Sequence, residues 1–408
     1  MVLKSPKGTR DLVSNNYSKF KIICDFISDL SQQKGYEYLE TPIFELSDVF
    51  IKNLGDTTDI IKKEIYCLVD KGKEKLVLRP EFTAGVVRAF ITNKLHLKNA
   101  GSFFSLGPLF RYDRPQAGRY RQFYQANFEK IGFSDRVSEI ELLLLGWKIL
   151  SNYLNDFVLY INHLGNVDIL AQYKKIVVDY FLQHKSKLSL LSQERIFDNP
   201  LRILDSKNDI DQQVVKGAPK ICELYTDEVR QQFEYVLKQL DKHGVNYIVD
   251  HTMVRGLDYY TGLIFEFKDK GIDNAQNTIL AGGRYDHLVS QMTSGKVDMP
   301  AIGMALGLDR LVLSANKNLQ VSISKRFGIV AYTHDQDRIL DILDSLDEVK
   351  ILVSPMHFTI DRQFKYMDDH NILHAILIYD DVIYYKNLST GDKVKIDDLR
   401  VFINDIKF

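Results

Sequence analysis

Apolar side chains recur at helical spacing along residues 17–34, with Phe20, Ile23 and Ile27 on one face, and this pattern predicts an amphipathic helix. A longer apolar-rich stretch at 136–154 predicts a second helix. Between these helices the apolar positions form shorter runs bounded by turn residues, as strands do. We expect a strand in 36–45 that is stopped by Pro42, because proline cannot donate a hydrogen bond to a neighbouring strand. We also expect strands at 64–69, 75–79, 103–112 and 120–133, and a further helix that starts near Thr83.

The second half of the chain changes character twice. Residues 166–246 are rich in Lys, Gln and Asp and repeat with helical periodicity, which predicts a helical insertion in strand-rich surroundings. Strands resume over 248–267. Beyond Lys325 strands and helices alternate, an order typical of a separate small α/β domain. We therefore expect an α+β domain at 1–325, interrupted by the insertion, and a C-terminal α/β domain at 326–408.

Length and composition limit the class of protein. A chain of 408 residues is too long to fold around one compact core, so we expect two or three domains. Its content of 45% hydrophobic and 26% charged residues is typical of globular proteins. The 3 cysteines are far apart and unsuited to a disulfide framework or a zinc site, which favours the cytoplasm. We expect no signal peptide, and no membrane helix, because no apolar run approaches ~18 residues. With a net charge of -1, any contact to nucleic acid must use local basic patches.

One such patch is FRYDRPQAGRYRQFYQ, residues 110–125, which concentrates arginines around a Pro-Gln-Ala-Gly turn. Side chains alternate along a strand, so Gln125 and Glu129 share one face of the outgoing strand, roughly 13 Å apart. If Arg111 on the paired strand points to the same face, it can reach a small molecule lying there, and a guanidinium suits phosphate oxygens bidentately. The patch is therefore either a solvated basic hairpin or a phosphate-binding device.

A second stretch offers a surface on which a flat ligand could lie. In PAIGMALGLDRL, residues 300–311, the alternating positions Gly303, Ala305 and Gly307 leave one strand face almost without side chains. Such a face allows close approach by a ligand or by another backbone. Arg310 follows at an expected helix start, where phosphate is favoured. The alternative is close packing of strand against helix, with no ligand.

Two further segments place polar side chains near the ends of expected elements. Glu81 and Thr83 stand at the mouth of the expected helix, where a carboxylate either caps the helix or binds an ammonium group. VRGLDYYTG, residues 254–262, puts an arginine, an acid and paired tyrosines into one loop without apolar periodicity, which makes a pocket wall credible. The residues of this loop are Arg255, Asp258, Tyr259 and Tyr260.

Together these stretches resemble the histidyl-tRNA synthetases, a family of class II aminoacyl-tRNA synthetases. KGTRDL (7–12) matches the family's opening, GYEYLETPIFE resembles motif 1, the basic hairpin resembles motif 2 and AIGMALGLDRL resembles motif 3. VRGLDYY and AGGRYDHL are similar to the two histidine-specific signatures, and NPLRILDSK (199–207) in the insertion is also family-like. The resemblance covers essentially the whole chain. It implies a class II catalytic domain built on an antiparallel sheet, followed by a C-terminal anticodon-binding domain.

The resemblance also implies a role for each candidate residue on the nucleotide side. Arg111 would clamp the α-phosphate of ATP, and Arg310 would clamp the γ-phosphate. Arg255 would stabilise the charge on the α-phosphate during reaction. Arg119 would help to hold ATP or the acceptor end of tRNA, and the residues near that end would be Gln116 and Arg121.

On the histidine side the resemblance implies six residues. The ammonium group would be held by Glu81 and Thr83, and Gln125 would orient the amino acid backbone. Glu129 and Tyr260 would hydrogen-bond the imidazole nitrogens. Tyr259 would line the pocket.

The reaction and the partners follow from the same resemblance. The histidine carboxylate would attack the α-phosphorus of ATP, giving histidyl-adenylate and pyrophosphate, and the terminal ribose hydroxyl of tRNA(His) would then take the histidyl group. A carboxylate is already nucleophilic, so the enzyme needs alignment and charge neutralisation, supplied by arginines and Mg²⁺. No residue is assigned as a metal ligand, and motif 1 implies a homodimer. The alternative interpretation is a histidine-sensing regulatory subunit of ATP phosphoribosyltransferase. The complete set of site residues and the presence of the C-terminal domain both argue against it.

Overall fold

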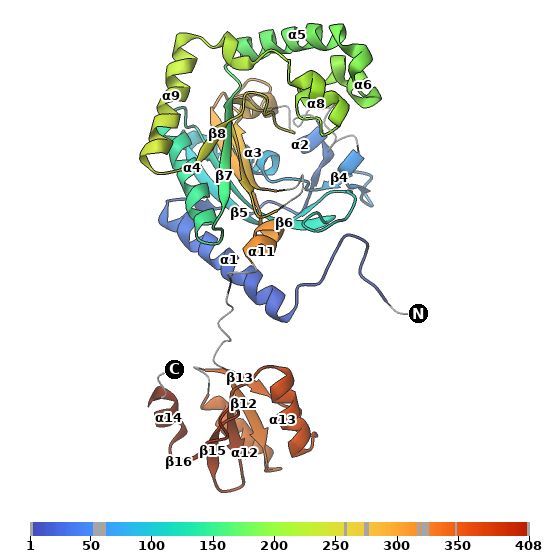
Figure 1. Ribbon diagram of the computed structural model, residues 1–408. Coiled ribbons are helices and arrows are strands. Elements are labelled where there is room, and N and C mark those ends of the chain that lie inside the picture. Colours follow the sequence, from blue (N-terminus) through green and yellow to red (C-terminus); the bar gives the residue numbers. More distant parts are fainter. Residues whose placement is uncertain are drawn as a thin grey trace. The chain divides into compact units, whose positions relative to one another are not determined.

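The computed structural model describes residues 3–51, 63–256, 259–272, 277–315, 319, 326–346 and 349–405. These residues form two compact units, one within 1–319 and the other within 320–408 (Figure 1). Each unit has its own sheet and its own hydrophobic core. The two units are therefore described separately.

A mainly antiparallel sheet of eight strands organises the first unit, and it confirms the expected fold class. In spatial order the strands are β1 (Glu37–Tyr38), β5 (Gly101–Phe110), β6 (Gln122–Ile131), β11 (Ala301–Gly307), β10 (Thr278–Arg284), β9 (Thr261–Asp269), β7 (Phe157–His163) and β8 (Tyr247–Val249). The outermost pairs, β1 with β5 and β7 with β8, are parallel, and the pairs between them are antiparallel. The two strands of the basic hairpin are β5 and β6, and the strand with the bare face, β11, pairs directly with β6.

The two faces of this sheet differ because side chains alternate along each strand. One face is apolar and packs against α1 (Ser14–Gln33) and α4 (Arg136–Ser151) in the main hydrophobic core. A second apolar cluster on the other face includes residues of α2 (Ser47–Ile51), α3 (Thr83–Thr92) and α10 (Leu288–Met292). A short 3-10 helix (Leu95–Lys98) follows α3, and α11 (Leu308–Ala315) follows β11. These elements leave Gln125 and Asn127 of β6 and the small residues of β11 open on this second face.

The strand expected at 36–45 is two strands that belong to two sheets. Residues 37–38 form β1 of the large sheet, and β2 (Phe44–Leu46) pairs with β4 (Lys75–Leu78), which pairs in turn with β3 (Cys67–Val69). Between β1 and β2 the buried guanidinium of Arg79 donates a hydrogen bond to the Thr41 carbonyl at 2.5 Å. A side chain therefore replaces a neighbouring strand as the partner of this backbone.

Residues 167–242 are helical in the region where the sequence predicts an insertion. Its helices are α5 (Val167–Gln183), α6 (Leu190–Asp198), α7 (Leu201–Leu204), α8 (Asp209–Val215) and α9 (Asp227–Lys242), with 3-10 turns at Lys185–Lys187 and Ile221–Leu224. Side-chain oxygens cap the first turns of four of these helices, as expected at helix starts, and belong to Asn166, Ser189, Asn208 and Thr226. Figure 1 shows α5, α6 and α8 grouped together. Their buried residues continue the main core, so the insertion is fixed to the sheet.

The second unit is a small α/β fold, as the sequence predicts. In spatial order its strands are β13 (Lys350–Val353), β12 (Arg326–Ala331), β14 (His374–Ile378), β15 (Ile383–Asn387) and β16 (Lys393–Ile396). The helices α12 (Gln336–Asp344) and α13 (Ile360–Asp369) contribute to two different apolar clusters, so they cover opposite faces of the sheet, and α14 (Leu399–Asp405) ends the unit. None of the helices described in either unit is both long and apolar enough to span a membrane.

Candidate active site

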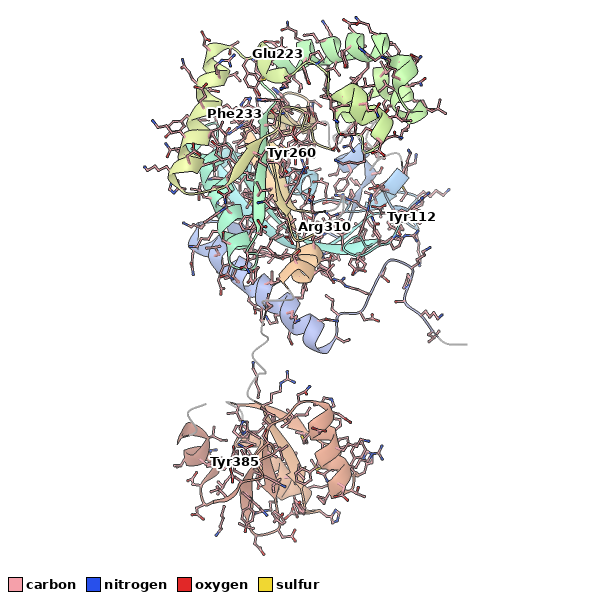
Figure 2. The ribbon with its side chains drawn as sticks, viewed as in Figure 1. Tyr112, Glu223, Phe233, Tyr260, Arg310 and Tyr385 are labelled. Atoms are coloured by element: carbon pink, nitrogen blue, oxygen red, sulfur yellow. The ribbon has the colours of Figure 1, made fainter. Side chains whose placement is uncertain are left out.

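A cavity of about 400 Å³ opens on the polar face of the large sheet. Its floor is formed by β6, β10 and β11, and its walls by the start of α3, the β5–β6 loop, the loop before β9 and the start of α11. Figure 2 labels two of the lining residues, Tyr260 and Arg310. The candidate residues that line the cavity are Glu81, Thr83, Arg111, Arg119, Gln125, Arg255, Tyr259, Tyr260 and Arg310. Segments far apart in the sequence therefore meet in one site, and Asp258 lies outside the described residues.

Glu129 is fully buried and is joined to the lining residues by hydrogen bonds. Its carboxylate accepts a hydrogen bond from the Thr83 hydroxyl at 2.5 Å and one from the Asn127 side-chain amide at 2.9 Å. It also accepts one from the Tyr285 hydroxyl. Burial outweighs these bonds and raises the pKa of Glu129 to about 7. A carboxylate so poorly solvated would be stabilised by a ligand that brings a further hydrogen-bond donor.

The bare face of β11 makes room for this carboxylate. A Cβ atom on Gly303 would lie 1.7 Å from Glu129 Oε2, so any larger residue would occupy the place of the carboxylate. Ala305 and Gly307 continue the same strip and also line the cavity. The small residues of β11 thus have two effects. Gly303 lets the Glu129 carboxylate lie close to the strand, and the strip as a whole leaves the floor of the cavity open for a ligand.

Glu81 lies just before α3, accepts hydrogen bonds from its first amides and also lines the cavity. One carboxylate oxygen accepts a hydrogen bond from the Thr83 amide at 2.6 Å, and the other accepts from the Ala84 amide at 2.9 Å. Burial raises the pKa of Glu81, and these two backbone hydrogen bonds act against the rise. The capping role and a role in binding an ammonium group are therefore compatible, because a carboxylate can accept more than two hydrogen bonds.

Positive charge gathers in the same cavity around Arg111, Arg119 and Arg310. Arg310 donates hydrogen bonds to the Gly118 carbonyl at 3.1 Å and to the Thr278 carbonyl at 2.7 Å. Burial, followed by repulsion from Arg119 and Arg111, lowers the pKa of Arg310. Arg310 is repelled by its cationic neighbours and is held by neutral carbonyls, so a bound anion would stabilise it.

Arg255 is held by a carboxylate that the sequence did not reveal. Its guanidinium forms an ion pair with Glu266 of β9, and its Cζ lies 5.8 Å from the centre of the Tyr260 ring. Although burial acts to lower it, the pKa of Arg255 is raised because Glu266 favours the charged form. Glu266 also accepts a hydrogen bond from the Thr278 hydroxyl at 3.0 Å. Arg255 is therefore a fixed cation in the cavity wall.

Gln116 and Arg121, the residues assigned to the acceptor end of tRNA, are not among the described residues that line the cavity. Gln116 is exposed in the hairpin turn, where its backbone pairs with that of Arg119. The guanidinium carbon of Arg121 lies 3.9 Å from the centre of the Tyr112 ring, and its amide donates to the Gly8 carbonyl at 2.7 Å. Both residues therefore belong to the hairpin outside the cavity.

The N-terminal segment KGTRDL supports the cavity from outside. Gly8 has a φ of +84°, a conformation that glycine adopts without strain. Arg10 pairs with Asp309 at the start of α11, and its guanidinium carbon lies 4.1 Å from the centre of the Tyr120 ring. Asp309 also accepts a hydrogen bond from the Tyr124 amide at 2.6 Å. The segment thus connects the hairpin to the helix that carries Arg310.

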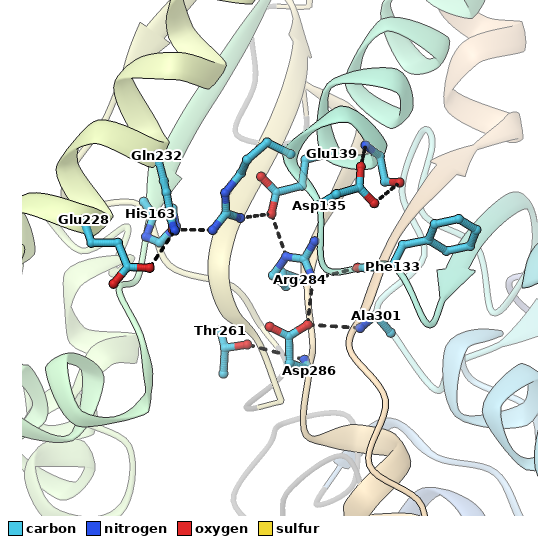
Figure 3. A network of polar contacts seen from close by, with 12 residues as sticks. Phe133, Asp135, Glu139, His163, Glu228, Gln232, Thr261, Arg284, Asp286 and Ala301 are labelled. Carbon is cyan, nitrogen blue, oxygen red and sulfur yellow. Dashed lines mark hydrogen bonds and ion pairs between the residues drawn. The ribbon is translucent and has the colours of Figure 1, made fainter. Parts of the chain in front are cut away.

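A buried network of polar contacts holds the strand end that carries Tyr285 (Figure 3). Arg284, its neighbour in the chain, pairs with Glu139 of α4 at 2.6 Å. Glu139 also pairs with Arg136, which donates a hydrogen bond to Gln232 of α9. The AGGRYDHL stretch therefore serves the site twice, because Tyr285 contacts Glu129 while Arg284 fixes the backbone beside it.

The residues that the structure describes contain no group of three or more His, Cys, Asp or Glu side chains that could hold a metal ion. The carboxylates of Asp113 and Asp309, which line the cavity, already pair with Arg119 and Arg10. Magnesium commonly takes most of its ligands from phosphate oxygens and water. Any magnesium ion here would therefore have to take most of its ligands from a bound nucleotide and from water.

A mainly antiparallel sheet that carries an arginine hairpin, a strand of small residues and a following helix with an arginine defines a class II aminoacyl-tRNA synthetase. The family model described as "Histidyl-tRNA synthetase" matches residues 8–311. The histidine–tRNA ligase of Rickettsia felis is 40% identical over 358 residues, which are 87% of this chain and 86% of that protein. The corresponding ligase of Rickettsia canadensis is 44% identical over 321 residues, 78% and 77% of the two chains. The crystal structure of apo S. aureus histidyl-tRNA synthetase matches with a TM-score of 0.80 and 28% identity, over 99% of each chain. The chain belongs to the histidyl-tRNA synthetase family.

Proposed function

We propose that the cavity activates L-histidine with ATP and that the chain then transfers the histidyl group to tRNA(His). The chain is a histidine–tRNA ligase, and histidine, ATP and tRNA are its substrates. The observation that carries the proposed chemistry is a single cavity that combines clustered arginines with a buried carboxylate, Glu129. A histidine-sensing regulatory subunit is not favoured, because relatives 40 to 44% identical over most of the chain are named histidine–tRNA ligases.

Histidine would lie with its imidazole toward Glu129 and its ammonium toward α3. Glu129 accepts a hydrogen bond from one ring nitrogen, and the Tyr260 hydroxyl pairs with the other. Glu81 and Thr83 hold the ammonium group, and the backbone of the substrate is oriented and enclosed by Gln125 and Tyr259. An apolar analogue would leave the Glu129 carboxylate without its partner, which is a large penalty in a buried site.

ATP would lie over the small residues of β11 with its phosphates among the arginines. We assign Arg111 to the α-phosphate, Arg310 to the γ-phosphate and Arg119 to the nucleotide or the acceptor end. The histidine carboxylate attacks the α-phosphorus, and pyrophosphate leaves. No general base is needed, because the nucleophile is already ionised. Arg255 stabilises the negative charge that develops on the α-phosphate in the transition state.

Magnesium would enter with ATP, held by the phosphate oxygens and by water. When bound, it would supply positive charge that neutralises the phosphates. The arginines of the cavity then complete the neutralisation, because they are permanently charged and are placed before the substrate binds.

The tRNA would meet the protein at two places. Gln116 and Arg121 lie on the exposed hairpin, where we propose that they contact the acceptor end. We assign the anticodon to the second unit, on the basis of the family resemblance. Because the three cysteines are free, we place the enzyme in the cytoplasm, where thiols remain reduced.

A homodimer is the proposed assembly. The small sheet that begins at the end of motif 1 exposes an apolar face, on which Phe44 is 57%, Leu46 is 50% and Leu68 is 44% exposed. These residues lie together because Leu46 and Leu68 both pair with Leu76 of β4, and Phe44 is two residues from Leu46. A second copy would cover this surface. Light scattering at micromolar concentration should give twice the mass of one chain, and a monomeric mass would contradict the proposal.

The activity is tested by histidine-dependent exchange of pyrophosphate into ATP, followed by charging of tRNA(His). We expect both reactions from the purified chain. A folded chain that binds histidine without exchange would instead support the regulatory role.

Arg255→Ala tests the assigned mechanism. We expect the adenylation rate to fall about 10²- to 10³-fold, with a much smaller loss of histidine affinity, because the charge that Arg255 meets develops in the transition state. Stopped-flow adenylation and equilibrium binding of histidine provide the two numbers. Equal losses in both would show that the assignment is wrong.

A further inference from the structure

The segment NPLRILDSK, residues 199–207, has no part in the roles proposed above. It follows α6 and contains α7 of the helical insertion. Its residues Ile203 and Leu204 are buried in the main hydrophobic core, in the same cluster as Val254. The segment and the start of the loop that carries Arg255 are therefore anchored in one core.

Arg202 of this segment lies against the backbone of that loop. A Cβ atom added to Gly256 would lie 3.3 Å from Arg202 Nη2, 3.5 Å from Nη1 and 3.6 Å from Cζ. The near-equal distances mean that the flat guanidinium covers Gly256, the residue next to Arg255. The Arg202 side chain is 22% exposed, and its Nη1 lies 3.7 Å from the Asp205 carboxylate of the same segment.

A second cavity, of about 540 Å³, lies between the segment and the loop. It is lined by Asn199, Pro200 and Leu201 on one side and by Val254, Arg255 and Tyr260 on the other. Arg255 and Tyr260 also line the substrate cavity, so the loop forms part of the wall of two cavities. Because Arg255 borders open space on two sides, a contact at the neighbouring Gly256 matters more for the position of its backbone.

We infer that Arg202 is a positioning residue for adenylate formation. It holds the backbone at Gly256, so that the neighbouring Arg255 meets the α-phosphate of ATP. Glu266 fixes the guanidinium of Arg255, and Arg202 fixes its backbone. A displacement of about 1 Å at such a group is enough to lower a rate ~10²-fold. The inference rests on the proposed role of Arg255, and it gives the helical insertion a part in catalysis.

Arg202→Ala in the full chain tests this inference by pyrophosphate exchange. We expect kcat to fall ~10- to 100-fold, with a change in KM for histidine below about 3-fold. Lys207→Ala is the matched control, because Lys207 is an exposed cation of the same segment that pairs with Asp205 at 3.0 Å. It should keep the kcat of the wild type. Equal kcat values for the wild type and Arg202→Ala would overturn the inference.

A second variant keeps the test decisive if Arg202→Ala does not fold. Gly256→Ala keeps the Arg202 side chain, but its new Cβ atom would lie 3.3 Å from the guanidinium, so the contact between Arg202 and the loop must change by a few tenths of an ångström. The same loss of kcat with an unchanged KM for histidine is expected. Activity equal to that of the wild type would overturn the inference.

A double-mutant cycle with Arg255→Ala separates positioning from general stability. If Arg202 acts through Arg255, the double variant has the kcat of Arg255→Ala alone. Losses that multiply would show that Arg202 acts independently. If the wild type itself lacks histidine-dependent exchange, the proposed function fails. An active wild type with unchanged Arg202→Ala contradicts this inference alone.

Discussion

Glu129 and Asp211 are both fully buried carboxylates of the first unit, but their pKa values are shifted in opposite directions. Asp211, in the insertion, accepts hydrogen bonds from the Ser189 amide and hydroxyl and from the hydroxyls of Ser192 and Ser206, at 2.6 to 2.8 Å. Burial alone would raise the pKa of Asp211, but these hydrogen bonds lower it. Glu129 accepts three hydrogen bonds in a deeper position, and burial raises its pKa to about 7. Hydrogen bonds from the protein stabilise the charged form of Asp211, whereas the charged form of Glu129 would be stabilised by a ligand.

Of the substitutions that test this difference, Glu129→Gln should have the largest effect, and the effect should be on kcat/KM for histidine. The amide keeps the size of the side chain but loses the charge that accepts the imidazole N–H, so kcat/KM for histidine should fall ~10³-fold. The free energy of unfolding should change little or rise, because a poorly solvated charge is removed. Exchange kinetics and urea unfolding measure the two quantities. Unchanged selectivity for histidine would remove Glu129 from the imidazole site.

Asp211→Ala should give the reverse result. Three serine hydroxyls and one amide lose their acceptor, which should lower the free energy of unfolding by about 3 kcal/mol. Activity per folded molecule should fall less than about 10-fold, because Asp211 acts through the fold and not on the substrate. A loss of activity as large as that of Glu129→Gln, without a loss of stability, would contradict the distinction.

The pH dependence of stability should have opposite signs at the two residues. The pKa of Glu129 is about 7 in the folded chain against an ordinary value of 4.5, so its contribution is complete below 4.5 and is lost as the pH rises through 7. The pKa of Asp211 lies below its ordinary value of 3.8, so its contribution is present above 3.8 and is lost as the pH falls through the folded value. Each slope is at most about 1.4 kcal/mol per pH unit.

Urea unfolding of the wild type, Glu129→Gln and Asp211→Ala without ligands measures these slopes. Each variant should lack the slope of the residue that it replaces. A Glu129→Gln variant with the slope of the wild type between pH 4.5 and 7 would show that Glu129 does not titrate there.

Tyr285→Phe should have the smallest effect. It removes one hydrogen bond to Glu129 and should raise the pKa of that carboxyl by less than about 1 unit, with a loss in kcat/KM below ~10-fold. The pH profile of kcat/KM for histidine reports the shift. Tyr36→Phe is the matched control, because the buried Tyr36 hydroxyl has no hydrogen-bond partner among the described residues. Equal profiles for both variants would contradict a role for Tyr285.

The elements with a strong local pattern could be predicted from the sequence. The hairpin of β5 and β6, the helix that starts at Thr83 and the helical insertion follow from periodicity and turn residues. The segment 36–45 could not be predicted in the same way. It passes from one sheet to another, and at the crossing the Thr41 carbonyl accepts a hydrogen bond from the buried Arg79, 38 residues further along the chain.

The cavity residues were predictable where a motif names them, but their supporting partners were not. Glu266 stands in an ordinary alternating strand, and only the fold brings it to Arg255. Tyr285 reaches Glu129 for the same reason. Two local signals did point to this site. Side-chain alternation puts Asn127 on the same face of β6 as Glu129, and the run of small residues in β11 includes Gly303, which leaves the space that the Glu129 carboxylate fills.

The most direct measurement is a crystal structure of the chain with a non-hydrolysable histidyl-adenylate analogue. It should show an imidazole nitrogen within hydrogen-bond distance of Glu129, the α-phosphate mimic in contact with Arg111 and Arg255, and Asp211 unchanged among its serines. An analogue bound elsewhere, or bound here with its imidazole turned away from Glu129, would contradict the assignment of this carboxylate and of the cavity around it.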